Sequence, residues 1–207
     1  MSFEKHKDWI HSRSVRWYFG DIFLLKIELI KLYYFSDAVA EFAITLTLST
    51  LKRISESIEA ARNGQWKLGD LLWMCGGSIF DSTVGIFGLG RIGYQIGERI
   101  KAFKPSRLLY HDLVKNSYAD SAYEFVDLDT LLGESDIVIC MCAVTPGTIG
   151  MFNMKLFQKM KPTGVFINCS RGVVVNQDDL CLALKTKTIA AAGKLKFLKS
   201  ISIYLML

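Results

Sequence analysis

The stretch TVGIFGLGRIGYQIGERIKAF, residues 83–103, decides the fold of this chain. It opens with an apolar, β-rich run, continues with glycines at positions 88, 90 and 93, and then becomes helical in pattern. A GxGxxG spacing between a strand and a helix is typical of a dinucleotide-binding unit. Gly88 would make the tight turn, Gly90 would admit a pyrophosphate, and Gly93 would let the helix pack on the sheet. A glycine-rich turn without a ligand is the alternative.

Further apolar runs follow this unit and alternate with helical stretches. They span residues 107–111, 124–126, 136–143, 164–170 and 188–193. None alternates with polar residues, so each is expected to be covered on both faces, as in a parallel sheet. The pattern predicts an α/β protein, with a Rossmann-type doubly wound parallel sheet over residues 83–193 and helices on both faces.

The second run ends at His111 and Asp112, nineteen residues after Gly93. A carboxylate at this position can accept hydrogen bonds from an adenosine ribose and repel a 2′-phosphate. Asp112 therefore favours NAD over NADP, although a solvated loop acid is the alternative. His111 is expected to border the adenosine rather than to act in catalysis.

The residues before the glycine motif predict helices. Residues 36–82 begin with a cap signal at Ser36 or Asp37, which predicts a long helix ending near Asn63 and Gly64, followed by an irregular connection. Residues 17–35 are very apolar but carry four charges, so we expect an amphipathic helix and not a membrane span. A helix anchored at a membrane surface is an alternative.

Composition excludes several classes of protein. The net charge is +5 over 207 residues and the basic residues are scattered, so no nucleic-acid interface is expected. The cysteines are five, an odd number, and three lie in or beside apolar runs, which predicts reduced thiols in a cytoplasmic protein. Cys140 and Cys142 are expected to point to opposite faces of a strand, so no metal site is predicted.

Several segments, in order, resemble one family. DAVAEF, NGQW, STVGIFGLGRIG, VTPGTIGMFNMKLFQKMK, VFINCSRGVVVNQDDL and IAAAG are similar to motifs of the D-isomer-specific 2-hydroxyacid dehydrogenases, in the glyoxylate reductase/hydroxypyruvate reductase branch. The likeness covers about Ser36 to Gly193. It implies hydride transfer between NAD(H) or NADP(H) and a small 2-oxo or 2-hydroxy acid, in a homodimer whose nucleotide-binding domain is inserted into a substrate domain.

The resemblance also assigns roles to residues. Those expected along the pyrophosphate are Gly90, Arg91 and Ile92, and those expected at the nicotinamide-side ribose are Ala143, Thr145 and Pro146. Cys169 would approach the nicotinamide. Arg171 would grip the substrate carboxylate and polarise its carbonyl, which suits a fixed cation just beyond a buried strand. A surface ion pair is the alternative for Arg171.

The two ends of the chain depart from the family. Residues 1–35 and 194–207 are unmatched, and the glutamate and histidine that the family places after the IAAAG segment are not found in KLKFLKSISIYLML. We therefore expect a substrate domain that is mostly missing and a chain that is catalytically incomplete. A non-enzymatic dinucleotide-binding or protein-interaction module is the alternative.

Overall fold

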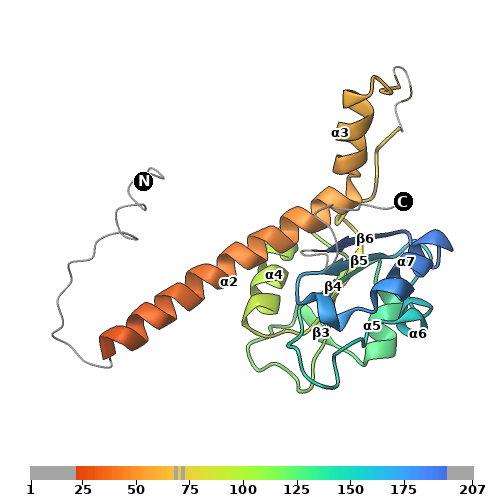
Figure 1. The fold of residues 1–207 in the computed structure, drawn as a ribbon. Coiled ribbons are helices and arrows are strands. Elements are labelled where there is room, and N and C mark those ends of the chain that lie inside the picture. The colour runs from red at the N-terminus through yellow and green to blue at the C-terminus, as the bar shows by residue number, and fades with distance from the viewer. Residues whose placement is uncertain (1–21, 68–69, 71–72, 195–207) are drawn as a thin grey trace, which may run out of the picture. The chain divides into compact units, whose positions relative to one another are not determined.

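A computed structural model describes residues 22–67, 70 and 73–194, with side chains from residue 35 onward (Figure 1). The chain divides into two compact units, residues 1–35 and 36–207, and the sheet belongs to the second. The predicted helix over 17–35 is observed from residue 22, while residues 17–21 and the tail after Lys194 lie outside the described residues. In the described part, no helix is both long and apolar enough to cross a bilayer.

The sheet has six parallel strands in the order β3-β2-β1-β4-β5-β6, which confirms the predicted doubly wound topology. The strands are β1 (Thr83–Phe87), β2 (Arg107–His111), β3 (Tyr123–Phe125), β4 (Ile137–Cys140), β5 (Val165–Asn168) and β6 (Ala191–Lys194). All neighbouring pairs run parallel, so every strand ends at the same edge of the sheet. This carboxyl edge is where the connecting loops gather.

Helices cover both faces of the sheet. They are α2 (Ile22–Leu51), α3 (Ile54–Arg62), α4 (Arg91–Lys101), α5 (Leu128–Glu134), α6 (Met154–Phe157) and α7 (Gln177–Lys185), with a short 3-10 turn η1 (Gly172–Val174). The second half of α2 and all of α4 lie on one face, and α5, α6 and α7 lie on the other.

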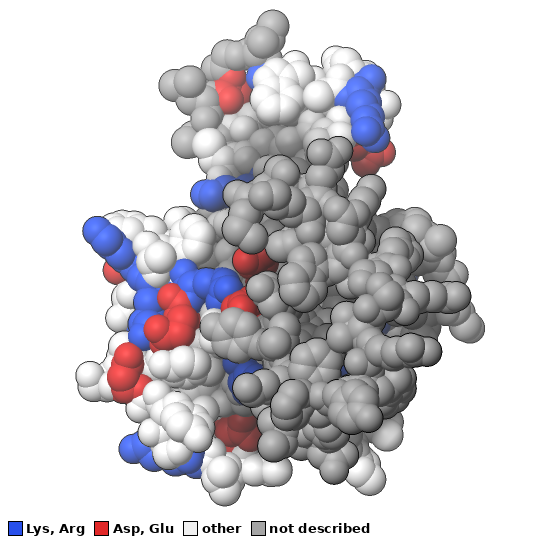
Figure 2. Space-filling model, turned by 90° about the vertical axis from the view of Figure 1, so that its left-hand side faces the viewer, with Lys and Arg blue, Asp and Glu red and all other residues white. Residues whose placement is uncertain are grey.

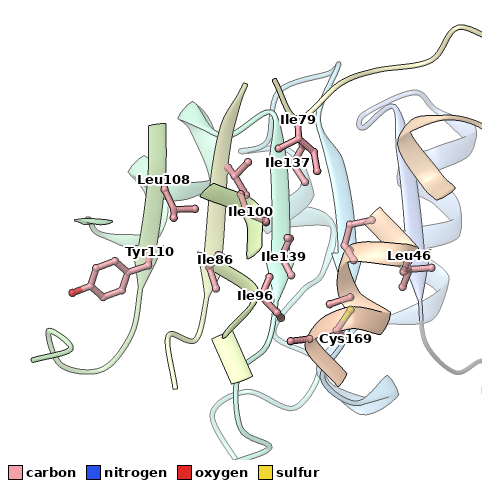
Figure 3. Packing of buried hydrophobic residues seen from close by; sticks show 14 of the residues in the cluster. Leu46, Ile79, Ile86, Ile96, Ile100, Leu108, Tyr110, Ile137, Ile139 and Cys169 are labelled. Carbon is pink, nitrogen blue, oxygen red and sulfur yellow. The ribbon is translucent and has the colours of Figure 1, made fainter. Parts of the chain in front are cut away.

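The first hydrophobic cluster lies between the sheet and helices α2 and α4 (Figure 3). Leu46 from α2 and Ile96 and Ile100 from α4 meet Ile86 and Ile139 from the central strands, and all five are at most 6% exposed. Full burial of an aliphatic side chain contributes about 1.5–3 kcal/mol. This layer therefore fixes α4, and with it the glycine turn that precedes α4.

The second cluster fills the opposite face of the sheet. Leu131 from α5, Phe157 from α6 and Ala183 from α7 are fully buried against Val138 and Phe166. Phe166 also stacks at a tilt on Phe152, with ring centroids 4.7 Å apart. Apolar packing on both sides explains why β1, β4 and β5, which are buried at every position, lack polar alternation. The expectation is wrong for the edge strand β3, which is exposed at Glu124 and Phe125.

The predicted helix start at Ser36 or Asp37 is wrong. Helix α2 runs through both positions, and Ser36 is only 5% exposed. The helix that precedes Ser36 continues because helix propagation is cooperative, so a local cap signal inside a helical run does not stop it. The predicted single helix to Asn63 is also interrupted at Arg53, whose φ is 53°.

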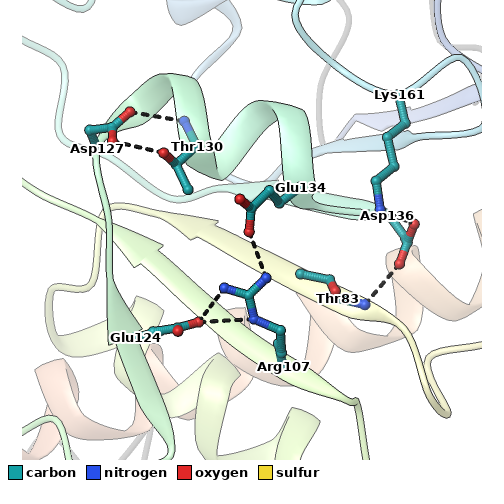
Figure 4. A network of polar contacts seen from close by, with 8 residues as sticks. All are labelled: Thr83, Arg107, Glu124, Asp127, Thr130, Glu134, Asp136 and Lys161. Atoms are coloured by element: carbon teal, nitrogen blue, oxygen red, sulfur yellow. Dashed lines mark hydrogen bonds and ion pairs between the residues drawn. The ribbon is translucent and has the colours of Figure 1, made fainter.

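A polar network ties the opposite, amino edge of the sheet together (Figure 4). Asp136 accepts hydrogen bonds from the Thr83 N–H (2.8 Å) and the Lys161 ammonium (2.7 Å). Arg107, at the start of β2, binds the Glu124 carboxylate from β3 at 2.7 Å and Glu134 at the end of α5. These contacts fix where the strands begin.

The charges on the face drawn in Figure 2 are mixed in sign. Arg99 binds Asp37 at 2.7 Å, and Lys101 binds Glu98 and Asp120 at 2.7 and 3.0 Å. In these contacts, as on the described part of the face drawn in Figure 2, lysine and arginine lie beside acidic residues.

Candidate functional site

The glycine motif forms the turn between β1 and α4. Gly88 has a φ of 97°, a conformation that residues with a side chain rarely adopt, and its N–H donates to the His111 carbonyl at 2.9 Å. A Cβ on Gly93 would overlap the Gly88 carbonyl oxygen, so only glycine allows α4 to pack this closely. Gly90 precedes the helix with nothing within 4 Å of an added Cβ. Gly88 thus makes the tight turn and Gly93 the close packing that the sequence predicted, and Gly90 faces open space before the helix.

A pocket of about 630 Å³ opens above this turn, at the carboxyl edge of the sheet. Its walls come from the ends of β1, β2 and β4 and from the start of α4. The predicted site residues in its lining are Gly88, Gly90, Arg91, Ile92, Gly93, Asp112, Ala143 and Thr145. The backbone N–H groups of the first turn of α4 face no intrahelical acceptor, and the helix dipole adds positive potential at this end. An anionic phosphate is the ligand that such a position favours.

Asp112 and His111 form the wall at the end of β2. Asp112 Oδ1 accepts a hydrogen bond from the Leu113 N–H at 2.7 Å, which fixes the carboxylate just beyond the strand. The His111 ring is stacked with those of Phe87 and Phe125, at interplanar angles of 4° and 6°. Its Nδ1 lies 2.9 Å from the Val126 carbonyl. These contacts hold the flat ring of His111 at the border of the pocket.

The loop after β4 supplies the facing wall. Thr148 Oγ1 accepts from the Thr145 N–H and donates to the Ala143 carbonyl, both at 2.8 Å. These bonds fold residues 143–148 into a tight turn over the pocket. Thr148 and Met151 also line the pocket, and neither is among the residues predicted from the sequence. A Thr-x-x-Thr turn signal was present in the sequence for Thr148, but Met151 reaches the pocket only through tertiary packing.

Cys140 and Cys142 were predicted to point to opposite faces, and this prediction is wrong. Their sulfurs lie 3.8 Å apart, and both residues pack with the second cluster. Residues two apart on a strand share a face, and β4 ends at Cys140, so Cys142 lies just past the strand. Cys142 lines the pocket, which the sequence analysis did not anticipate. Among the described residues, no group of three or more histidine, cysteine or acidic side chains is placed to bind a metal.

Three predicted site residues do not line this pocket. Cys169 is 1% exposed in the first cluster (Figure 3), and burial raises the pKa of its thiol to about 12. Pro146 is exposed in the turn after β4. Arg171 is exposed after β5, at the same edge of the sheet as the pocket.

The turn that carries Arg171 is well fixed. Asn168 donates to the Arg171 carbonyl at 3.1 Å and accepts from the Ser170 N–H at 3.0 Å. Ser170 Oγ in turn donates to the Cys142 carbonyl at 2.6 Å, which joins this turn to the pocket wall. No described acidic side chain forms an ion pair with Arg171, so the alternative of a surface ion pair gains no support in that part of the chain.

The fold and the glycine turn define a Rossmann-type dinucleotide-binding domain. Residues 44–194 match the model of the D-isomer specific 2-hydroxyacid dehydrogenase NAD binding domain. The chain belongs to the D-isomer-specific 2-hydroxyacid dehydrogenase family and carries its NAD-binding domain.

Relatives in sequence and structure agree with this assignment. The chain is 48% identical over 160 residues to the glyoxylate reductase/hydroxypyruvate reductase of Mus musculus, which covers 76% of this chain and 49% of the mouse protein. It thus spans about half the length of that relative.

Two solved structures share the fold. A putative D-isomer specific 2-hydroxyacid dehydrogenase from Polaromonas sp. JS6 66 has a TM-score of 0.75 at 34% identity, covering 81% of this chain and 53% of its own. The NAD complexed form of a family member from Lactobacillus delbrueckii ssp. bulgaricus has a TM-score of 0.71 at 29% identity, covering 77% and 47%.

Proposed function

We propose that residues 36–194 form the cofactor-binding part of an oxidoreductase that moves hydride between NAD(H) and a small 2-oxo or 2-hydroxy acid. One observation carries the proposal: the glycine turn presents the amino end of α4 to a pocket walled by Asp112 and by the loop after β4. A dinucleotide has a phosphate pair at its centre and a ribose on either side. Each of these parts is proposed to lie on a different wall of the pocket.

The pyrophosphate is proposed to lie on the glycine turn. Gly88, Gly90 and Gly93 would bring backbone close to it, and Arg91 and Ile92 would line its path. Arg91 belongs to the first turn of α4 and lines the pocket, so its charge adds to the helix dipole there.

The two riboses are proposed to lie on either side of the turn. Asp112 would accept hydrogen bonds from the adenosine ribose, and Ala143, Thr145 and Pro146 would border the nicotinamide-side ribose. A second cavity of about 760 Å³ shares Asp112 with the first and is also lined by Lys115. Lys115 would partly offset the repulsion between Asp112 and a 2′-phosphate, so the preference for NAD over NADP is expected to be modest.

Arg171 is proposed to bind the substrate carboxylate. A guanidinium can bind a carboxylate through two parallel hydrogen bonds, which orients the adjacent carbonyl. Cys169 is proposed to border the nicotinamide through its backbone, because its side chain is buried in the core. When bound, the nicotinamide supplies or accepts the hydride.

The experiment that tests this proposal is a calorimetric titration of the purified 207-residue chain with NADH. Saturable binding with one site per chain is expected. Absence of binding by a folded protein, verified by circular dichroism, would contradict the proposed function.

Self-association is a further part of the proposal. Phe42 on α2 and Ile54 and Ile58 on α3 are between 41% and 46% exposed, and burial of such side chains is a common driving force for association. Leu46 and Leu51 on α2 are buried in the core and add nothing to this exposed surface. We therefore infer a homodimer, which light scattering at micromolar concentration tests; a monomer would contradict it.

The unbridged thiols of Cys140, Cys142, Cys169 and Cys181 support a reducing compartment such as the cytoplasm.

A further inference from the structure

Two thiols meet at the wall of the pocket. The sulfurs of Cys140 and Cys142 lie 3.8 Å apart, and Cys142 lines the pocket directly. We propose that this pair is an oxidation site that controls cofactor binding: a peroxide converts the two thiols to a disulfide, and the disulfide weakens the binding of the dinucleotide. The inference rests on the proposed function, because it assumes that this pocket holds NAD(H).

The two thiols differ in the way that such a reaction requires. Cys142 is half-buried at the pocket, and the hydrogen bond from the Cys140 thiol holds the pKa of Cys142 below its ordinary value. Cys140 is fully buried, and burial raises its pKa well above the ordinary range. A thiolate is the nucleophile in oxidation chemistry. Cys142 therefore reacts first, and Cys140 resolves the product.

The chemistry balances with a peroxide as the oxidant. The Cys142 thiolate attacks one peroxide oxygen, the O–O bond breaks, and a sulfenic acid and hydroxide form. The Cys140 sulfur then attacks the Cys142 sulfur, the S–O bond breaks, and hydroxide leaves and takes up the Cys140 proton to become water. The thiols lose two electrons and the peroxide gains them. A dithiol reductant reverses the reaction by exchange.

Closing the disulfide must move Cys142 rather than Cys140. The sulfurs have to approach by roughly 1.8 Å to reach a bond length of about 2.05 Å. Cys140 is held in the sheet between Phe87 and Asn168, whereas Cys142 lies past the end of β4. The only described side-chain bond to the Cys142 backbone comes from Ser170. The displacement therefore falls on the pocket wall.

That wall is in contact with the glycine turn. The Cys142 N and Cα lie 2.8 Å from where a Cβ on Gly88 would stand, so Cys142 backbone packs directly on Gly88. Moving Cys142 displaces Gly88 or opens a gap beside it. Because equilibrium coupling between two sites is reciprocal, bound NADH should shift the thiol–disulfide equilibrium toward the dithiol by the same factor as oxidation weakens NADH binding.

The test uses the full chain, prepared reduced and then treated with limited hydrogen peroxide. NADH affinity is measured before oxidation, after oxidation and after a dithiol reductant, and the peptide that contains residues 140–142 is examined by mass spectrometry. We expect an internal disulfide in that peptide, at least about a tenfold loss of affinity, and recovery on reduction. Cys140→Ala, a residue outside the pocket lining, should bind NADH when reduced but form no internal disulfide.

The matched control is Cys181→Ser, which changes a thiol on α7 outside the pocket and should behave as the unmodified chain does. Failure of the 140–142 disulfide to form in the unmodified chain would overturn the inference. Formation of the disulfide with unchanged NADH affinity would overturn it as well. In both cases NADH binding by the reduced protein would leave the proposed function standing, so the two failures are distinguishable even where a variant does not fold.

Discussion

The Gly93 Cα packs directly against the carbonyl oxygen of Gly88, leaving no room for a side chain between α4 and the glycine turn. Gly90, three residues earlier, faces open space in the pocket. The same motif thus contains one glycine that the fold requires and another that is proposed to make room for the ligand. Substitutions at the two positions should separate folding from binding.

Gly90→Val is expected to abolish NADH binding while leaving the melting temperature almost unchanged, because the new side chain would fill the proposed path of the pyrophosphate and not the core. Gly93→Ala is expected to destabilise the domain by about 1–3 kcal/mol, as overpacking does. Calorimetry and thermal unfolding measure the two effects. A Gly90→Val protein with unchanged affinity would contradict the proposed path of the pyrophosphate.

Asp112 is expected to give NADH a modest advantage over NADPH, because its carboxylate lies at the end of β2 where a 2′-phosphate would repel it. Asp112→Ser removes the charge and should bring the dissociation constants for NADH and NADPH closer together. Titration of both proteins with both cofactors measures it. Tighter binding of NADPH than of NADH by the unmodified chain would show this interpretation to be wrong.

Turnover of hydroxypyruvate or glyoxylate by the 207-residue chain is expected to remain at background. Arg171 is exposed, and an exposed ion pair contributes only about 0–1 kcal/mol. His111 is the one histidine of the described residues, and it is stacked on Phe87 with its Nδ1 at the Val126 carbonyl. Loss of NADH absorbance over hours is the assay, and Arg171→Ala should not change it. Robust turnover that Arg171→Ala removes would contradict the expectation.

Ser135 Oγ is the one buried side-chain oxygen or nitrogen in the described part of the chain without a hydrogen-bond partner. Ser135→Ala should therefore be neutral, or stabilise the protein by up to about 1 kcal/mol, because it removes a polar group that burial penalises. Ser82→Ala is the matched control: Ser82 Oγ is buried and donates to the Ile79 carbonyl at 2.7 Å. Its loss should cost about 1 kcal/mol in urea unfolding. Equal losses in both variants would mean that Ser135 is satisfied in solution.

Asp136 should make the stability of the domain depend on pH in the acidic range. Burial opposes its ionisation, but hydrogen bonds from Lys161 and the Thr83 N–H outweigh this, so the pKa lies below its ordinary value of 3.8. A carboxyl group whose pKa is lower in the folded state than in the unfolded state stabilises the folded protein at pH values above the unfolded-state pKa. This stabilisation is lost as the pH falls through the folded-state pKa. Asp136→Asn should cost about 1 kcal/mol at pH 7, since both partners are more than a third exposed.

The difference between Asp136→Asn and the unmodified chain should shrink as the pH falls below about 4. Asp129→Asn is the control, because the Asp129–Lys159 pair is on the surface with Asp129 67% exposed. It should change the unfolding free energy by less than about 0.5 kcal/mol. A pH-independent cost at Asp136 would show that the charge is not what stabilises the sheet there.

The sequence predicted the sheet and the glycine turn well because both depend on local signals. Apolar runs without alternation located the strands, and the GxGxxG spacing located the turn. The end of α2 could not be predicted in this way: Gly77 donates to the Leu51 carbonyl at 2.9 Å, and this contact with a segment 26 residues away satisfies the end of the helix where no cap residue marks it.

The candidate site was predicted where it follows strand ends and missed where it depends on packing. Asp112 and Ala143 were located by their place after β2 and β4, and both line the pocket. The apolar run 136–143 predicts one continuous strand, whereas β4 ends at Cys140, so the sequence does not predict that Cys142 lines the pocket. Cys169 follows an apolar run in the sequence, as a residue lining the pocket would, but its side chain is buried in the core.

The network around Asp136 lies at the amino edge of the sheet, whereas every residue proposed to touch the cofactor follows a strand at the carboxyl edge (Figure 4). Strands and helices connect the two edges, but none of the residues in the Asp136 network lines the pocket. A substitution in that network is therefore expected to leave the pocket lining unchanged. Charge reversal of the Asp136–Lys161 pair would then change the melting temperature without changing the affinity for the cofactor. Likewise, new side chains in the loops beyond β2 and β4 would alter the choice of ligand while the sheet that carries these loops stays the same.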